Sequence, residues 1–201
     1  MKDIFQKANQ NSLLYVFTLC SCLFLLSGCP SGGSTVKNNT NGTKTTATNS
    51  KKWKLLKGSP APAFSLRGMK GRLHSLKKYK GKVVLVNFWA TWCGPCKKEM
   101  VHFNKMYTKY KAKGFIVLAI SGDEPNQAAQ IGPIISRYGY KFPVMHDKDG
   151  RIFERYYPQR NFPFTALIDR KGQMRITHQG YNPGDEKVME KHVQELLKEK
   201  P

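Results

Sequence analysis

The most constraining feature of the sequence is the stretch at positions 82–100, KVVLVNFWATWCGPCKKEM. It begins with an apolar run, rich in valine and aromatic residues and interrupted only by Asn87, which predicts a strand buried on both faces. The segment Cys93–Cys96 follows at the start of a predicted helix. Pro95 suits that place, because the N–H that proline lacks would have no partner within the helix. We therefore expect a central strand to lead directly into a helix, with two cysteines at the junction.

This position has chemical consequences for the two cysteines. A cysteine at a helix start lies beside unpaired backbone N–H groups and the positive end of the helix dipole, which stabilise its thiolate. Lys97 and Lys98 add positive charge nearby. The second cysteine returns to the same face one turn later, close enough to form a small disulfide. We predict that Cys93 is the exposed nucleophile and that Cys96 is the shielded thiol that resolves a mixed disulfide.

Other interpretations of the cysteine pair remain open. It could be half of a zinc site, although no second cysteine pair follows. Delivery of Cu(I) by the two cysteines and a distant histidine, or an inert structural disulfide, is also compatible with the spacing. A disulfide that closes so short a loop would stabilise the fold little. The histidines show no paired ligand spacing: His74, His102, His146, His178 and His192.

The segment NFWATWCGPCKKEM at positions 87–100 resembles the active-site segment of the thioredoxin superfamily. It is most similar to the membrane-anchored, extracytoplasmic thiol–disulfide oxidoreductases of the TlpA/ResA type, and the resemblance extends from about Ser59 to the C-terminus. It implies an α/β, thioredoxin-like three-layer fold with a mixed central sheet and helices on both faces. It also implies a thiol–disulfide oxidoreductase. The sequence contains no nucleotide or flavin motif, so we expect no cofactor, no metal and electrons supplied by another protein's thiols.

The resemblance assigns a further site residue, Pro163. In the family a cis proline at this place lies against the two cysteines and leaves the preceding backbone free to pair with an extended substrate. A trans proline at the start of a strand is the alternative. This chain has Phe164 where the family usually has threonine, and Phe162 is bulkier than the usual preceding residue. These departures put the shape of the substrate groove in question.

Glu99 is a second position that the resemblance singles out. In ResA-like proteins a glutamate at this place helps to set the cysteine pKa values and the shape of the active site. The alternative is an ordinary first-turn glutamate that complements the helix dipole. Thioredoxins proper carry a buried aspartate where this chain has Asn87, which cannot ionise. If Glu99 is close to the sulfurs and desolvated, its pKa should be raised and coupled to theirs.

Aromatic and turn residues next to the cysteines are candidates for binding a partner protein. We expect Trp89 to pack in the core and Trp92 to lie beside the disulfide, although both could serve packing alone. The predicted substrate-binding residues are Trp92, Gly94, Pro95 and Phe162.

The N-terminal region has the pattern of an export signal. An apolar block at 13–26 follows two lysines and is too short for a comfortable membrane span, as in a signal-peptide core. It ends in Leu26–Cys29, LSGC, which resembles the bacterial lipobox, whose cysteine is lipidated. We therefore predict a lipoprotein signal peptide at 1–28 with lipidation at Cys29. An uncleaved anchor and a cysteine present by chance are the alternatives.

A change in composition follows the predicted signal. Residues 30–52 consist mainly of Ser, Thr, Asn, Gly and Lys and contain no acidic residue, so they cannot bury enough surface to fold. We predict a lipidated, disordered tether at 29–52 and a thioredoxin-like domain at 53–201.

The formal net charge of +21, from 34 Lys and Arg against 13 Asp and Glu, raises the question of a polyanionic partner. The basic residues are scattered along the chain without forming a stripe, and an exported domain meets little nucleic acid. We therefore predict no nucleic-acid partner. Anionic lipid headgroups or wall polymers are possible neighbours, and a generally basic solvated surface explains the charge equally well.

Periodicity predicts the remaining elements. The helix that Cys93–Cys96 opens should close at Gly114, with Met100, Phe103 and Met106 on its inner face. In the last helix, Val188 and Val193 should face inward. The other expected elements are an opening hairpin at 60–76, strands at 115–120 and 142–145, helices at 123–138 and 150–157, a strand pair at 162–169 and 174–179, and a terminal helix at 184–200.

These observations predict an enzyme on the outer side of a bacterial membrane. The Gly-Pro pair between the cysteines matches thioredoxin itself, whose potential is reducing, so we favour a monomeric reductase that receives electrons from an upstream membrane thiol donor. By resemblance, apocytochrome c awaiting haem attachment is the leading substrate, followed by other exported disulfide proteins. The alternatives are a copper-binding chaperone on a thioredoxin scaffold, a general disulfide oxidase or isomerase, and a peroxidase of the related peroxiredoxin type.

Overall fold

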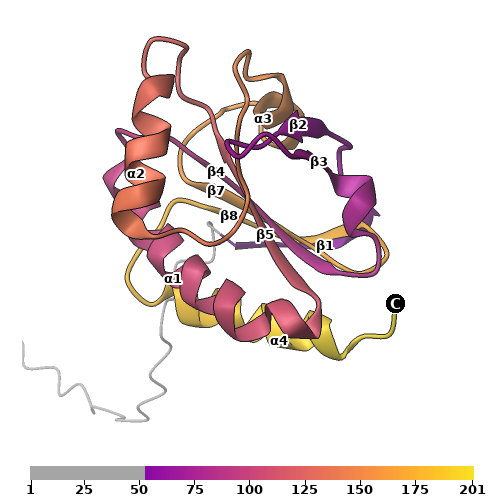
Figure 1. The fold of residues 1–201 in the computed structure, drawn as a ribbon. Coiled ribbons are helices and arrows are strands. Elements are labelled where there is room, and N and C mark those ends of the chain that lie inside the picture. The colour runs from indigo at the N-terminus through magenta and orange to yellow at the C-terminus, as the bar shows by residue number, and fades with distance from the viewer. Residues whose placement is uncertain (1–52) are drawn as a thin grey trace, which may run out of the picture. The chain divides into compact units, whose positions relative to one another are not determined.

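A computed structural model of the chain describes residues 53–201. The predicted signal peptide, Cys29 and the tether lie outside the described residues. The main sheet has six strands in the order β1-β8-β7-β4-β5-β6 (Figure 1). Strands β4, β5 and β6 run parallel to one another, whereas β7 is antiparallel to β4, β8 to β7 and β1 to β8. The strand bounds are β1 Trp53–Pro60, β4 Val83–Trp89, β5 Phe115–Ser121, β6 Val144–His146, β7 Phe164–Ile168 and β8 Gln173–Gln179.

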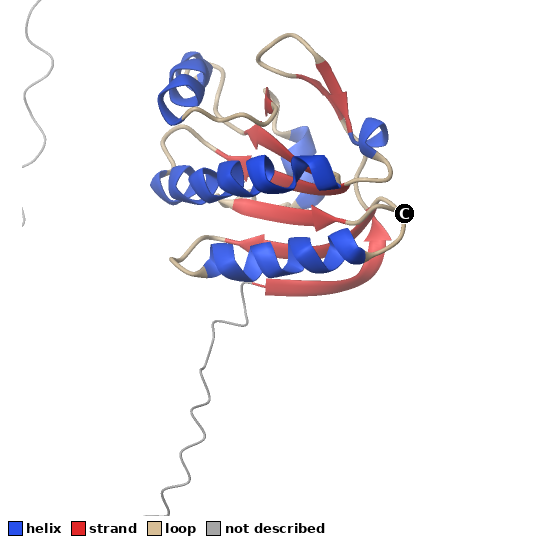
Figure 2. Ribbon diagram, turned by 60° about the horizontal axis from the view of Figure 1, so that its bottom comes forward, coloured by secondary structure: helices blue, strands red, loops and turns tan. Residues whose placement is uncertain are grey.

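Helices cover both faces of the sheet. Helix α1 and helix α4 lie side by side on one face, and α2 packs on the same face (Figures 1 and 2). Helix α3 covers the opposite face together with part of the opening hairpin. The structure is thus the three-layer α/β fold that the sequence predicts. The helices are α1 Gly94–Tyr110, α2 Ile131–Tyr138, α3 Arg151–Tyr156 and α4 Asp185–Lys198, and the hairpin strands are β2 Ser65–Arg67 and β3 Leu73–Ser75.

Strand β4 lies inside the sheet between β7 and β5, and every one of its residues is buried. Val83, Leu85 and Trp89 face the core layer beneath α1 and α4, whereas Val84 and Phe88 face the layer beneath α3. A strand whose two faces are both covered has no polar side, which explains the continuous apolar run in the sequence.

Several boundaries differ from the sequence-based expectations. The helix expected from 123 begins only at Ile131, after a short 3-10 turn, because the Asp123 side chain bonds to a distant loop instead of starting a helix. In α4, Met189 faces the core and Val188 is 37% exposed, so the inward assignment of Val188 was wrong. The inner face instead follows the i, i+4, i+7 spacing of Met189, Val193 and Leu196.

Other elements agree with the predictions more closely. The helix after the cysteines ends at Tyr110, and a 3-10 turn carries the chain to Gly114, whose φ of 92° ends it in the left-handed region. The first strand of the main sheet, β1, was not predicted. Most of its residues are exposed because it lies at the sheet edge beyond β8, so it lacks a regular apolar pattern.

Candidate active site

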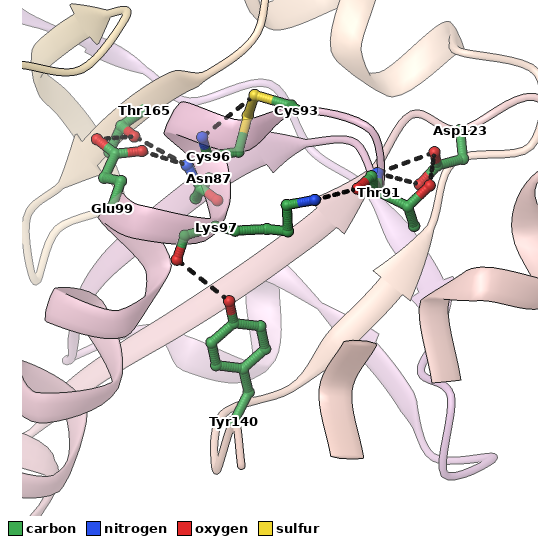
Figure 3. The surroundings of a disulfide bond; sticks show 9 residues. All are labelled: Asn87, Thr91, Cys93, Cys96, Lys97, Glu99, Asp123, Tyr140 and Thr165. Carbon is green, nitrogen blue, oxygen red and sulfur yellow. Dashed lines mark hydrogen bonds between the residues drawn. A yellow bond between two sulfur atoms is a disulfide. The ribbon is translucent and has the colours of Figure 1, made fainter. Parts of the chain in front are cut away.

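The cysteine pair lies at the junction between the end of β4 and the start of α1 (Figure 3). Cys93 is the N-cap of α1 and Cys96 lies in its first turn; their sulfurs form a disulfide with the Cα atoms 5.3 Å apart. The Cys96 backbone N–H donates to Cys93 Sγ at 3.2 Å. Cys93 is 5% exposed and Cys96 is fully buried, so Cys93 is the more accessible of the two, although it is far more covered than the exposed nucleophile that the sequence led us to expect. The helix N-terminus thus directs a backbone donor at the more accessible sulfur, which favours its thiolate.

A buried aspartate holds the turn that precedes the cysteines. Asp123 accepts hydrogen bonds from the Thr91 backbone N–H at 2.9 Å and 3.0 Å and from Thr91 Oγ1 at 2.7 Å. Ser121 Oγ donates to the same carboxylate at 2.6 Å. On the other side of the turn, Lys97 Nζ donates to the Thr91 carbonyl at 2.8 Å (Figure 3). Sequence reasoning missed this role of Asp123, because a bond across more than thirty positions leaves no local pattern.

Glu99 is buried within a small polar cluster beneath the cysteines. Asn87 Nδ2 donates to Glu99 Oε2 at 3.1 Å, and Thr165 Oγ1 donates to Oε1 at 3.5 Å (Figure 3). Burial, followed by the negative charge of Asp185, raises the pKa of Glu99 well above its ordinary value, and the two hydrogen bonds only partly oppose this rise. The raised pKa agrees with the expectation for a desolvated glutamate at this place.

A histidine that the sequence did not single out for the active site completes this cluster. The His178 side chain is 1% exposed, and its Nδ1 lies 4.0 Å from Glu99 Oε1 while its Nε2 lies 3.4 Å from Asp185 Oδ2. Its ring stacks on Trp53, with the centroids 3.9 Å apart. Only the pairing of β8 with β7 and the start of α4 bring these groups together, so no spacing along the chain could have indicated them.

The loop before β7 lies beside the cysteine turn. The Phe162–Pro163 peptide bond is cis, and the Pro163 carbonyl accepts from the Gly180 N–H at 2.8 Å. The Phe162 ring packs edge-on against Trp92 with the centroids 5.6 Å apart. This contact brings the predicted proline loop and the predicted cysteine turn together.

The other predicted contact residues lie on the surface of the same turn. Trp92 is 62% exposed, and Gly94 and Pro95 are also exposed. Trp89, by contrast, is fully buried in the core, as predicted. Apolar surface is thus exposed next to the nearly covered Cys93.

Two kinds of feature are absent from residues 53–201. No helix in that range combines the length and the apolar character that crossing a bilayer requires. Within the same range, the side chains of His, Cys, Asp and Glu form no group of three or more that could hold a metal ion.

Comparisons with known proteins agree with this geometry. The family model described as Redoxin matches residues 56–197. Thiol-disulfide oxidoreductase ResA of Bacillus cereus is 41% identical over 127 residues, which are 62% of this chain and 70% of that protein. Among solved structures, the Chlorobium tepidum protein assigned as thiol:disulfide interchange protein DsbE is 35% identical with a TM-score of 0.65, covering 72% of this chain and 99% of that one.

A third similar protein is named as a lipoprotein. The exposed lipoprotein thioredoxin of Streptococcus pneumoniae is 27% identical with a TM-score of 0.57, and the match covers 67% of this chain and all of that one. Its similarity concerns the folded domain. Because the family match spans most of the chain and the sequence relatives are thiol–disulfide oxidoreductases, this chain belongs to the Redoxin family of the thioredoxin superfamily, as a ResA-like thiol–disulfide oxidoreductase.

Proposed function

We propose that this oxidoreductase is lipid-anchored at Cys29 outside the cytoplasm, where it reduces disulfides in exported proteins. The signal-like block, the LSGC box and the polar segment at 30–52 support export and tethering. Apocytochrome c is the leading substrate, because relatives of this chain are named ResA and DsbE and the resemblance is to proteins of cytochrome c maturation. The Gly-Pro pair between the cysteines supports net reduction.

The observation that carries the proposed chemistry is the difference in burial between Cys93 and Cys96. In the reduced enzyme, the Cys93 thiolate attacks one sulfur of a client disulfide, and the other client sulfur leaves with the electron pair of the broken bond. Cys96 then loses its proton and attacks Cys93, which releases the second client thiol and closes the Cys93–Cys96 disulfide. A membrane thiol donor restores the two thiols by the reverse exchange and is itself oxidised to a disulfide.

Glu99 is proposed to receive the proton that Cys96 loses. It lies one turn after Cys96 on α1, and both side chains are buried. A carboxyl with a raised pKa is a stronger base than an ordinary surface glutamate, which makes it a better proton acceptor. The client-binding surface is proposed to comprise Trp92, Gly94, Pro95 and Phe162, with Pro163 presenting the adjacent backbone.

Trapping experiments test the substrate class. Cys96→Ala should freeze the mixed disulfide at Cys93, so clients can be recovered from the membrane fraction and identified by mass spectrometry. Cys93→Ala is the matched control and should recover none. Recovery dominated by cytochrome c precursors would support the proposed substrate, whereas a broad mixture without them would contradict it and indicate general disulfide reduction.

A second experiment tests the anchor. Cys29→Ala should release the protein from the membrane fraction and abolish labelling by a fatty-acid analogue. Cys22→Ala, within the same predicted leader, should leave both unchanged. Membrane retention and labelling of the Cys29 variant equal to the original chain would overturn lipid anchoring at this position.

A further inference from the structure

His178 connects the buried glutamate of the active site to the start of helix α4. It comes from β8, where it pairs with Thr165 of β7, and its side chain lies beneath α4. One ring nitrogen faces Glu99 and the other faces Asp185. Such an arrangement lets an imidazole accept a proton on one nitrogen and release another from its opposite nitrogen.

The two gaps in this chain of groups are short enough to close by side-chain rotation. The 4.0 Å between His178 Nδ1 and Glu99 Oε1 exceeds a hydrogen bond by about 1 Å. The terminal torsion of a glutamate side chain is broad, so its carboxyl can rotate over that range at little cost. The 3.4 Å between His178 Nε2 and Asp185 Oδ2 needs a smaller adjustment.

Asp185 provides the exit from the protein interior. Its side chain is 17% exposed, whereas the side chains of Glu99 and His178 are 3% and 1% exposed. The same carboxyl oxygen of Asp185 accepts the Asn182 N–H at 2.7 Å, which fixes it at the N-terminus of α4. Glu99 by itself has no comparable contact with solvent, and a buried acid that must gain and lose a proton in each cycle needs a path to water.

The other titratable groups near Glu99, His178 and Asp185 do not link the buried glutamate to solvent. Tyr181, in the loop before α4, interacts electrostatically with Glu99 and Asp185. Burial and a hydrogen bond to Glu186 raise the pKa of Tyr181 to about 12, so it stays neutral. From α4, His192 contacts Trp53 with the ring centroids 5.8 Å apart and is bonded to Glu195. Strands β1, β4 and β7 contribute no charge, since they present Trp53, Asn87 and Thr165.

We propose that His178 and Asp185 form a proton path between Glu99 and solvent, and that His178 is a positioning residue acting through Glu99 when the mixed disulfide is resolved. This inference rests on the role proposed above for Glu99. The Cys96 proton passes to Glu99, Glu99 passes one to His178 Nδ1, and His178 Nε2 releases one through Asp185 to water. The electron pair left on Cys96 forms the new S–S bond, and the client sulfur leaves with the pair of the old one.

The experiment follows the two sulfurs separately. When the reduced protein is mixed with the aromatic disulfide reagent dithionitrobenzoate, Cys93 attack releases the first coloured thiolate and Cys96 attack on the mixed disulfide releases the second. His178→Gln should slow the second release by about 100-fold near neutral pH, at the low end of proton-transfer catalysis, and flatten its pH profile. The first release should keep its rate.

Asp185→Asn gives an independent test, because it predicts the direction in which the pKa of Glu99 changes. Because the charge of Asp185 raises the pKa of Glu99, its removal should lower the Glu99 pKa measured by carboxyl carbon NMR, and it should also slow the second release. His192→Gln is the matched control, since this histidine touches Trp53 as His178 does but is bonded to Glu195. It should leave both releases and the Glu99 pKa unchanged.

The outcomes separate this inference from the proposal on which it rests. If Glu99→Gln slows the second release while His178→Gln and Asp185→Asn retain its rate and pH profile, the proton path is wrong and the role of Glu99 stands. If Glu99→Gln has no effect, the role of Glu99 fails as well. Should His178→Gln not fold, as judged by circular dichroism, Asp185→Asn decides alone, and an unchanged second release in that variant overturns the path.

Discussion

Asn87 on the central strand donates its side-chain amide to Glu99 on the following helix, with Nδ2 and Oε2 3.1 Å apart. The same amide group also lies 3.1 Å from Thr165 Oγ1. A neutral donor at this position supports the glutamate without competing for its proton. The acidic group of the site therefore lies on the helix that carries the cysteines and not on the strand beneath it.

Glu99 should make the stability of the protein depend on pH. The pKa of Glu99 is raised in the folded state above its ordinary value of 4.5, so its contribution is fully present below about that pH and is lost as pH rises toward the folded pKa. The loss is at most about 1.4 kcal/mol per pH unit. Urea unfolding of the oxidised protein at several pH values should show this decline, and Glu99→Gln should remove it. A parallel decline in the variant would contradict the assignment to Glu99.

Asn87→Asp should place two carboxyl groups in one buried site. Because neighbouring carboxylates cannot both ionise cheaply, we expect a loss of at least about 2 kcal/mol in the free energy of unfolding at neutral pH. The loss should shrink in acid, where both carboxyl groups retain their protons, so the measurement at acidic pH is the control for the one at neutral pH. Urea unfolding at acidic and neutral pH measures both, and a loss that did not depend on pH would indicate a packing effect instead.

The strand, the helix and the position of the cysteines at their junction were predictable because each follows from a local pattern. The apolar run of β4, the proline in the first turn of α1 and the two cysteines at their spacing lie within nineteen consecutive positions, 82–100. Local chemistry therefore specifies the junction, and resemblance adds Glu99 and Pro163. The structure brings two of the predicted client-binding residues, Trp92 and Phe162, into contact, and their binding role stays a prediction.

The rest of the site depends on pairing between distant segments. Asp123, His178 and Asp185 reach the cysteine region only through the sheet order and the docking of α4. The acidic residue at 123 suggested a helix start, because aspartate before a proline-containing segment often has that role. Its carboxylate bonds instead to Thr91, and a tertiary contact of this kind overrides the local preference.

Asp123→Ala should destabilise the fold and disturb the cysteine turn. Thr91 would lose the acceptor of its buried N–H and of its hydroxyl, which predicts a loss of about 1–3 kcal/mol. Thiol exchange at Cys93 should also slow, because the turn before it would no longer be fixed. Chemical unfolding and the rate of Cys93 alkylation measure the two effects. Asp149→Ala, which removes an exposed ion pair with Arg151, should change stability by less than about 0.5 kcal/mol and leave alkylation unchanged.

Trp92→Ala should impair client binding without unfolding the protein. The side chain is 62% exposed, so its removal should change the free energy of unfolding by less than about 0.5 kcal/mol. The KM for reduction of a disulfide-bearing peptide should rise while the rate with a small thiol reagent is kept. Leu55→Ala, at an exposed residue on the edge strand β1, should alter neither the KM for the peptide nor the rate with the small reagent. An equal rise in KM for both variants would argue against a specific contact surface at Trp92.

Gly122→Ala should disturb Phe162 directly. A Cβ atom at Gly122 would lie 2.7 Å from the Phe162 Cζ atom, so the ring must move from its contacts with Trp92 and Phe153. We expect a loss of about 1–3 kcal/mol from overpacking, together with weaker reduction of peptide disulfides. Gly132→Ala in α2 meets no atom within 4 Å and should leave peptide reduction unchanged.

A compensating change tests the cause of the Gly122 effect. Combining Gly122→Ala with Phe162→Leu shortens the side chain that the new methyl group meets, so the double variant should recover at least about 1 kcal/mol relative to the sum of the single changes. Urea unfolding of the four proteins completes the thermodynamic cycle. Strict additivity would mean that the methyl group acts on the backbone at Gly122 and not through Phe162. Recovery of stability without recovery of peptide reduction would assign the Phe162 ring itself to client binding, since only its shape then differs.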